Sequence, residues 1–143
     1  MILLSVAALL ILMLPIASQS EISQGTEKST SADYLEALRV ANSFLWAWVA
    51  RDSGAGLQLI STRLRTEIKD ESWLRQFMMG LSNPHHQAFE LGMGRREGAT
   101  RYSFPVTLYE LYSGENEGFA YTGVLGLVKQ GDVWRIDVLP KLP

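Results

Sequence analysis

The last third of the chain alternates between apolar and polar positions, which is the pattern of β-strands. In the segment that begins at Ala99, apolar side chains recur at every second residue, as in a strand with one buried face. They are Tyr102, Phe104, Val106 and Leu108. Residues 119–129 are apolar at both sets of alternate positions and predict a central strand. Residues 133–139 resume the alternation and predict a third strand, whose apolar members are Trp134, Ile136 and Val138.

Glycine-bearing turns separate these strands, so they predict an antiparallel meander. A polar loop covers residues 113–118, and residues 129–132 make a tight hairpin in which a glycine can adopt a positive φ. Upstream, residues 86–94 also alternate and predict a further strand, which turns through residues 95–98 into the next one. The sequence therefore predicts a four-stranded antiparallel sheet.

Two features predict that this sheet is strongly curved. The apolar pattern steps from Leu108 to Leu111, an odd interval that predicts a β-bulge near residues 109–110. Gly123 and Gly126 in the neighbouring strand permit a bend.

A long helix is predicted before the sheet. It begins at Asp33, which with Glu36 forms an N-terminal cap, and it ends near Asp52. Residues 44–50 are apolar on every side of this helix. Such a helix must be covered on more than one side, by the curled sheet, by a pocket or by a subunit interface. We therefore expect the protein to self-associate.

Two shorter helices complete the helical layer. One covers residues 56–64, and the other lies between an N-cap at Asp70 and a stop at Gly80 and Pro84. The predicted fold class is α+β, with N-terminal helices packed on a curved four-stranded antiparallel meander.

The first 20 residues predict a secretory signal peptide or a membrane anchor. Residues 1–17 carry no charged side chain, and small residues follow Pro15, as they do before a signal-peptidase cleavage site. A run of this length also lies at the lower limit for spanning a bilayer of ~30 Å. Residues 21–32 are polar and predict a flexible linker, which leaves residues 33–143 for the folded domain. We expect a protein exported to the periplasm or the extracellular space, or one anchored in the membrane if the segment is retained.

The charge and cysteine content excludes several functional classes. The 143 residues include 13 Lys and Arg against 15 Asp and Glu, and the basic residues are scattered, so no nucleic-acid-binding surface is expected. The absence of cysteine excludes disulfides, thiolate metal sites and a cysteine nucleophile. No phosphate-binding or dinucleotide-binding glycine motif occurs, and we expect no cofactor and no metal.

Two short motifs connect the chain with a known fold. Residues 131–136 have the form Gly-Asp-x-Trp-x-Ile, and residues 50–57 form an acidic, glycine-bearing turn after the first predicted helix. With the predicted helices and curved sheet, the sequence resembles the NTF2-like superfamily of the cystatin-like α+β cone fold over roughly residues 33–140. The resemblance implies a cone-shaped cavity. Because the superfamily includes isomerases, dehydratases, polyketide cyclases, transport factors and exported bacterial domains of unknown role, it implies no single activity.

Asp137 is a catalytic candidate that follows from this resemblance. Isomerases of the superfamily use an aspartate base with a tyrosine or an acid, which makes Asp137 the residue to examine together with Tyr34, Tyr102 or Tyr121. However, Asp137 alternates with Arg135 on the face opposite Trp134, a pattern that favours a cross-strand ion pair on a solvated face.

The two histidines are weaker candidates. His85 and His86 are neighbours, and neighbours on a strand face opposite ways, so they are not expected to share a metal ion. One of them, such as His86, could act as an acid or a base inside the cone.

The large aromatic side chains fit either a filled core or a ligand pocket. The candidates for pocket lining are Trp46, Phe104 and Trp134. Because the inward positions of the strands are apolar, we expect an exported, non-catalytic binding or scaffold domain. Its expected partners are a second copy of the chain, an envelope protein or a small apolar ligand. The alternative is a small-molecule enzyme of the isomerase or dehydratase type that uses the cone cavity.

Overall fold

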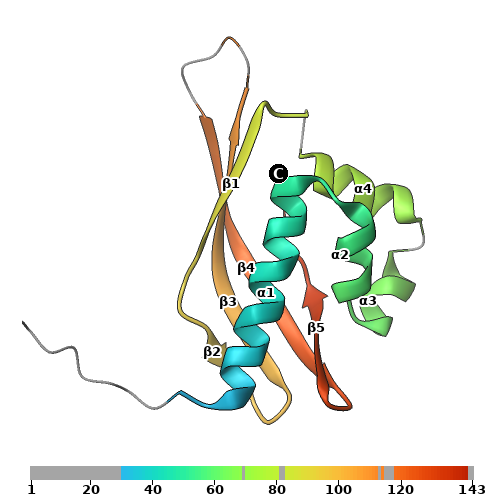
Figure 1. Cartoon of the computed structure of the whole chain (residues 1–143), viewed down its shortest axis with the longest axis vertical. Helices are drawn as coiled ribbons and strands as arrows, with labels where there is room; N and C mark the ends of the chain where they lie inside the picture. The colour runs from blue at the N-terminus through green and yellow to red at the C-terminus, as the bar shows by residue number, and fades with distance from the viewer. Residues whose placement is uncertain (1–29, 69, 81–82, 113, 115–117, 142–143) are drawn as a thin grey trace, which may run out of the picture.

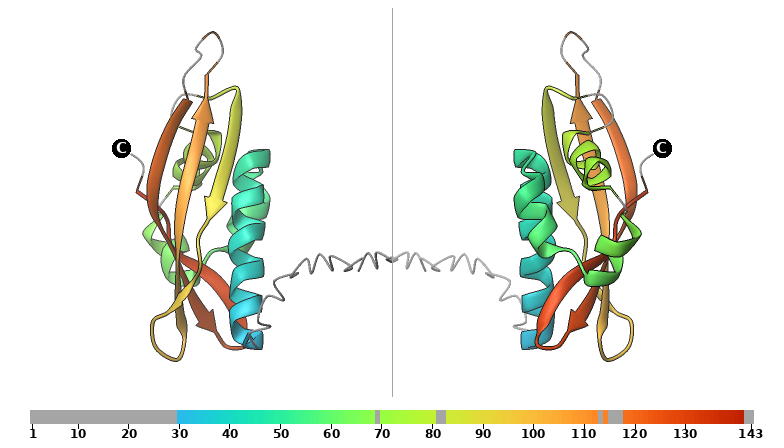
Figure 2. Two further views of the ribbon diagram at one scale, coloured as in Figure 1. Left: turned by 90° about the vertical axis from the view of Figure 1, so that its left-hand side faces the viewer. Right: turned by 90° about the vertical axis from the view of Figure 1, so that its right-hand side faces the viewer.

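A curved antiparallel sheet carries a layer of helices on its inner face (Figures 1 and 2). The computed structural model describes residues 30–141, apart from 69, 81–82, 113 and 115–117. The helices are α1 (Ala32–Ala50), α2 (Ser53–Leu59), α3 (Thr62–Glu67) and α4 (Glu71–Met79). The strands are β1 (His86–Leu91), β2 (Arg95–Arg96), β3 (Arg101–Leu111), β4 (Gly118–Gln130) and β5 (Val133–Val138). This arrangement confirms the predicted α+β class with N-terminal helices on a curved antiparallel sheet.

The predicted signal or anchor segment, residues 1–20, and the linker up to residue 29 lie outside the described residues. Within the described part of the chain, no helix combines the length and the apolar character needed to cross a membrane.

Helix α1 lies across the inner face of the sheet (Figure 1). Its N-cap differs from the predicted one. Ser31, rather than Asp33, is the N-cap, and its hydroxyl accepts a hydrogen bond from the Tyr34 amide at 3.2 Å. The helix ends at Ala50 because Arg51 adopts a left-handed conformation with a φ of 57°.

The predicted second helix, residues 56–64, is two helices in the structure. Asp52 caps α2, and the chain then extends at Ile60, which forms a parallel bridge with Ile136 of β5. Ser61 caps α3 by accepting a hydrogen bond from the Leu64 amide. The contact of Ile60 with β5 is long-range and is not specified locally, whereas Ser61 is itself a typical N-cap residue and is the local signal for the new helix. The third predicted helix is confirmed as α4, with its cap at Asp70 and its end at Gly80.

The sheet has the order β1-β3-β4-β5, with the short β2 also paired to β3. Strand β4 is therefore central, as predicted. The expected strand over residues 86–94 ends at Leu91 as β1, and the short β2 lies at residues 95–96, where a turn was predicted. Among the described residues the sheet therefore has five strands rather than four. The chain leaves the ladder after Leu91 and passes close over Phe104 at Gly94, where a Cβ would collide with the phenyl ring.

The β-bulge lies in β5 and not near residues 109–110. The register of β3 with both neighbours is continuous through those residues. In contrast, Leu127 pairs with Ile136 while Gly126 pairs with Val138, so Asp137 has no partner on β4. A Cβ on Gly126 would lie 2.8 Å from that of Val138, which shows how closely the end of β5 approaches β4.

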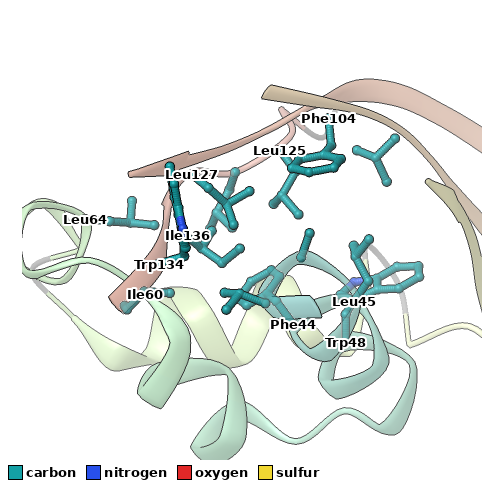
Figure 3. Packing of buried hydrophobic residues seen from close by; sticks show 14 of the residues in the cluster. Phe44, Leu45, Trp48, Ile60, Leu64, Phe104, Leu125, Leu127, Trp134 and Ile136 are labelled. Atoms are coloured by element: carbon teal, nitrogen blue, oxygen red, sulfur yellow. The ribbon is translucent and has the colours of Figure 1, made fainter. Parts of the chain in front are cut away.

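The core lies between α1 and the inner faces of β3, β4 and β5 (Figure 3). The fully buried side chains include Phe44, Leu45, Trp48, Phe104, Leu125, Leu127 and Ile136. The indole Nε1 of Trp48 donates a hydrogen bond to the Phe77 carbonyl oxygen at 3.0 Å, which ties α1 to α4. The inward apolar positions predicted for β3 fill the core, as do Trp134 and Ile136 of β5. Val138 was predicted on the same face but is 45% exposed, because the bulge at Asp137 turns it to the outer face.

Candidate functional site

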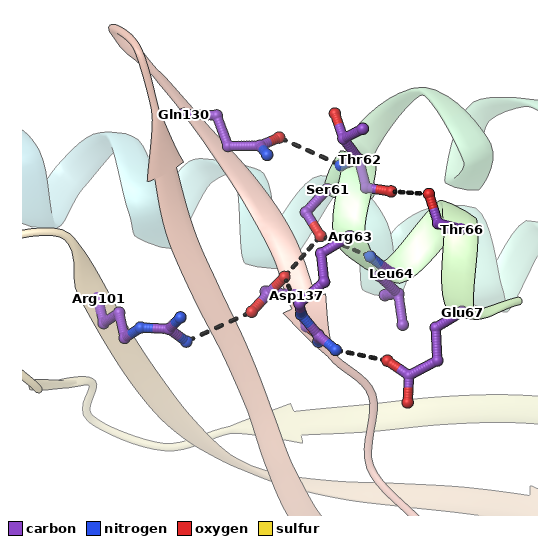
Figure 4. Close-up of polar contacts among 9 residues, drawn as sticks. All are labelled: Ser61, Thr62, Arg63, Leu64, Thr66, Glu67, Arg101, Gln130 and Asp137. Carbon is purple, nitrogen blue, oxygen red and sulfur yellow. Dashed lines mark hydrogen bonds and ion pairs between the residues drawn. The ribbon is translucent and has the colours of Figure 1, made fainter.

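Asp137 lies at the centre of a polar cluster that joins β5 to α3 and to the start of β3 (Figure 4). Its Oδ1 accepts hydrogen bonds from the Ser61 hydroxyl at 2.6 Å and from the Arg63 Nε at 2.9 Å. Its Oδ2 lies 3.3 Å from the Arg101 Nη1, and the Arg63 guanidinium also donates to the Asp137 carbonyl oxygen. We call Ser61, Arg63, Arg101 and Asp137 the Asp137 clamp.

Asp137 is only 3% exposed, which corrects the prediction of an ion pair on a solvated face. The bulge breaks the alternation, so Ile136 and Asp137 are consecutive buried residues, and α3 then covers the carboxylate. The ion pairs are formed with Arg63 and Arg101 rather than with Arg135.

Burial alone would raise the pKa of Asp137. The Ser61 hydroxyl, the Arg63 guanidinium and the charge of Arg101 together outweigh burial and hold the pKa of Asp137 below its ordinary value. A carboxylate that is fully ionised and already accepts these hydrogen bonds is a poor general base, since a base must accept a proton near the working pH.

The structure does not bring Asp137 together with the predicted tyrosines. Tyr102 is buried on the inner face, with its ring centroid 5.1 Å from that of Trp134 and 5.6 Å from that of Tyr34. The described hydrogen-bond partners of Asp137 include no tyrosine. The third candidate, Tyr121, lies on β4 opposite Leu108, toward the far end of the sheet.

Sequence reasoning missed a second buried carboxylate, Glu110. It is 1% exposed, and its Oε2 accepts a hydrogen bond from the Tyr112 hydroxyl at 2.6 Å. Gly80, the C-cap of α4, lies against the Glu110 carboxylate, with which a Cβ at Gly80 would collide. Burial raises the pKa of nearby Tyr121, and the charge of Glu110 acts in the same direction. We call Glu110, Tyr112 and Tyr121 the Glu110 cluster.

A signal for Glu110 was present in the sequence. If the alternation of β3 is continued beyond Leu108, residue 110 takes the next inward position. The predicted bulge at residues 109–110 hides this signal, because it places the apolar Leu111 rather than Glu110 on the inward face.

His85 and His86 both lie exposed at the start of β1, with ring centroids 4.8 Å apart. Among the described residues, no group of three or more His, Asp or Glu side chains could hold a metal ion.

The three aromatic pocket candidates lie in different surroundings. Phe104 and Trp134 are buried in the core. Trp46 is 62% exposed, and its ring meets Phe89 of the edge strand β1 edge-on at 5.4 Å. Trp46 therefore lies outside the buried core, at the contact between α1 and the edge strand β1.

The outer face of the sheet carries exposed apolar side chains. They are Pro105, Tyr109, Leu111, Val124 and Val138, which we call the outer-face patch. Pro105 and Val124 are register partners on β3 and β4, which places them side by side. A hollow of about 500 Å³ borders the patch, and Glu90, Thr107 and Thr122 contribute polar groups to its lining.

Comparisons with known proteins place the fold. No protein-family model matches the sequence, and curated protein sequences give no match. The structure is similar to a domain of unknown function with a cystatin-like fold from Nostoc punctiforme, at 15% identity and a TM-score of 0.59, over 80% of this chain and 81% of that one. It is also similar to a ketosteroid isomerase-like protein from Erwinia carotovora atroseptica, at 12% identity and a TM-score of 0.55, over 75% of this chain and 92% of that one. The chain has the cystatin-like cone fold of NTF2-like proteins.

Proposed function

We propose that this chain is an exported, non-catalytic binding or scaffold domain. The observation that carries the proposal is the state of Asp137, the residue best matched to an isomerase base. It is buried and already bonded to Ser61, Arg63 and Arg101, with a pKa held low. The inward aromatic side chains Phe104 and Trp134 are buried among other core side chains, which favours packing over catalysis.

Export is the part of the proposal that rests on the N-terminal sequence. The apolar residues 1–17 followed by small residues support a cleaved signal. Mass spectrometry of the protein from its native host is expected to show a mature chain that starts at or near Glu21. Intact Met1 in a membrane fraction would instead support a tethered scaffold.

Self-association through the outer-face patch is the proposed first interaction. An exposed apolar patch on a sheet favours contact with another protein surface. Sedimentation at micromolar concentration is expected to show a dimer that Val124→Asp dissociates, because a charge would be buried at the contact. Gln76→Asp, on an exposed position of α4, introduces the same residue away from the patch and is the matched control. A strictly monomeric wild type, or a dimer that survives Val124→Asp, contradicts this surface.

The alternative is an enzyme of the isomerase or dehydratase type, and the Glu110 cluster favours it. A buried carboxylate hydrogen-bonded to one tyrosine and near a second resembles an acid–base arrangement. Purified protein is therefore tested with a β,γ-unsaturated ketone, whose conjugation is followed by ultraviolet absorption. The binding proposal predicts no turnover above buffer. Turnover that Glu110→Gln abolishes and the exposed control Glu90→Gln retains would overturn it.

A further inference from the structure

A hollow of about 430 Å³ lies beside the edge strand β5, on the surface formed with α2 and α3. Its lining residues are Gln58, Ile60, Thr62, Arg65, Gln130, Val133 and Arg135, which we call the arginine groove. Ile60 is buried and Val133 half-exposed, so the groove has an apolar floor. All its other members carry polar side chains, and none carries a carboxylate.

Two backbone carbonyls hold the guanidinium groups of the arginine groove in place. Arg65 donates to the Leu57 carbonyl oxygen, and Arg135 donates to that of Gln58. These carbonyls belong to the last turn of α2 and have no partner within the helix. Each arginine therefore caps α2 and keeps a fixed position at the rim of the groove.

Neither of these two arginines has a carboxylate within ion-pair distance in the described part of the chain. The ion pairs that the described residues form include neither Arg65 nor Arg135, whereas Arg63 and Arg101 both pair with Asp137. A guanidinium group without a carboxylate partner is available to a carboxylate of another molecule, and such charge-assisted hydrogen bonds are roughly twice as strong as neutral ones.

We propose that the arginine groove binds an acidic peptide segment of a partner protein, with its carboxylates on Arg65 and Arg135. The amides of Gln58 and Gln130 lie beside the arginines and can bond the peptide backbone. The groove is shallow and borders an edge strand, where an extended segment has room to lie. A small ligand is normally buried over most of its surface, and the exposed side chains of this groove do not enclose one. The inference rests on the proposed binding function and names its partner class.

Fluorescence polarisation with the full-length mature chain tests this assignment. The probe is a dye-labelled octapeptide of alternating glutamate and valine, and its control replaces each glutamate with glutamine. The acidic peptide is expected to bind at least about tenfold more tightly, and the difference is expected to shrink as salt is added.

Gln130→Glu places a carboxylate in the groove without altering either arginine. The Gln130 Oε1 accepts a hydrogen bond from the Thr62 amide at 3.3 Å, and glutamate retains that acceptor (Figure 4). This variant is expected to weaken binding of the acidic peptide about tenfold or more. Gln76→Glu makes the same change on α4 and is expected to bind like the wild type. Thr62→Glu, at the start of α3, is the second variant if Gln130→Glu melts at a lower temperature.

Unchanged affinity in both groove variants, or an equal loss in Gln76→Glu, overturns the groove as the site. Displacement of the probe by citrate or inorganic phosphate at concentrations below the peptide's own Kd overturns the peptide assignment in favour of a small anion. The ketone assay and sedimentation on the same samples judge the binding function separately, so a failed groove does not decide that proposal.

Discussion

Replacing Asp137 with asparagine removes the charge at the centre of the Asp137 clamp and leaves its shape intact. The amide oxygen can stay at the Oδ1 position, where the Ser61 hydroxyl and the Arg63 Nε both donate. The amide nitrogen then takes the Oδ2 position and faces the Arg101 Nη1, which is also a donor. The substitution therefore weakens two hydrogen bonds and removes a third interaction.

The expected loss in the free energy of unfolding is about 2 kcal/mol. Hydrogen bonds to charged groups contribute about 1.5–3 kcal/mol each and neutral ones about 0.5–1.5 kcal/mol. The full difference is not lost, because the Arg63 and Arg101 side chains are 52% and 53% exposed and can turn to water. At about 3–6 °C for each kcal/mol in a domain of this size, the melting temperature is expected to fall by roughly 6–12 °C.

The pH dependence of this loss identifies the carboxylate as its cause. The pKa of Asp137 is lower in the folded state, so its contribution is fully present above the unfolded pKa of about 3.9. The contribution disappears as the pH falls through the folded pKa. Thermal unfolding followed by circular dichroism is therefore expected to show a constant difference between wild type and variant from about pH 5 to 8, and a shrinking one below about pH 4.

Asp132→Asn is the matched control, since Asp132 is exposed in the turn of the same hairpin and asparagine suits a turn equally well. It is expected to melt like the wild type at pH 7. An Asp137→Asn variant with an unchanged melting temperature at pH 7, or with the same deficit at pH 3 as at pH 7, would show that the Asp137 carboxylate does not stabilise the fold in this way.

Three further substitutions test the core, the end of α4 and the Asp137 clamp. Trp134→Ala is expected to lower the free energy of unfolding, measured by chemical denaturation, by about 3–5 kcal/mol, because Trp134 is 2% exposed. Trp46→Ala is expected to lower it by less than about 1 kcal/mol, because Trp46 is 62% exposed. Equal losses would contradict the assigned core. Gly80→Ala is expected to lower the free energy of unfolding by at least about 2 kcal/mol, since φ is 76° and the new Cβ collides with Glu110. Gly98→Ala meets only the strain of its φ of 91°. A Gly80→Ala variant as stable as Gly98→Ala would show that the Glu110 side chain moves away without loss of stability. Ser61→Ala is expected to lower the free energy of unfolding by about 2 kcal/mol, because it removes the α3 cap and a hydrogen bond to Asp137. Combined with Asp137→Asn, it is expected to cost less than the sum of the two single losses. Full additivity would mean that the two residues are not coupled.

Local chemistry was sufficient to predict most elements of the fold. The alternation of Tyr102, Phe104, Val106 and Leu108 predicts β3, and all four are buried. Asp70 and Gly80 bound α4 because capping and a positive φ depend on the residues themselves. Glycine in the 129–132 turn likewise predicts the hairpin between β4 and β5, where Gly131 has a φ of 61°.

The features that sequence reasoning missed depend on contacts between distant residues. The break at Ile60 exists because that residue pairs with Ile136, and nothing near Ile60 specifies this contact. The burial of Asp137 likewise requires a bulge against Gly126 and cover from α3. A strict period of two cannot include an extra residue, so it assigned Asp137 to a solvated face. Trp46 is the converse case, because it lies in an apolar run and yet is 62% exposed.

The Asp137 clamp joins parts of the chain that are far apart in sequence. Arg63 and Ser61 precede Asp137 by 74 and 76 positions, and Asp137 itself belongs to β5. A chain that emerges from its N-terminus can therefore form its helices and the β3–β4 pair before it can form the clamp. Contacts of such long sequence separation are slow to form, because loop closure must come first. If the protein is exported as proposed, the Asp137 clamp can form only after β5, Val133–Val138, has crossed the membrane. Formation of the clamp is then a late step of folding, and the chain lacks this stabilising contact while it is being translocated.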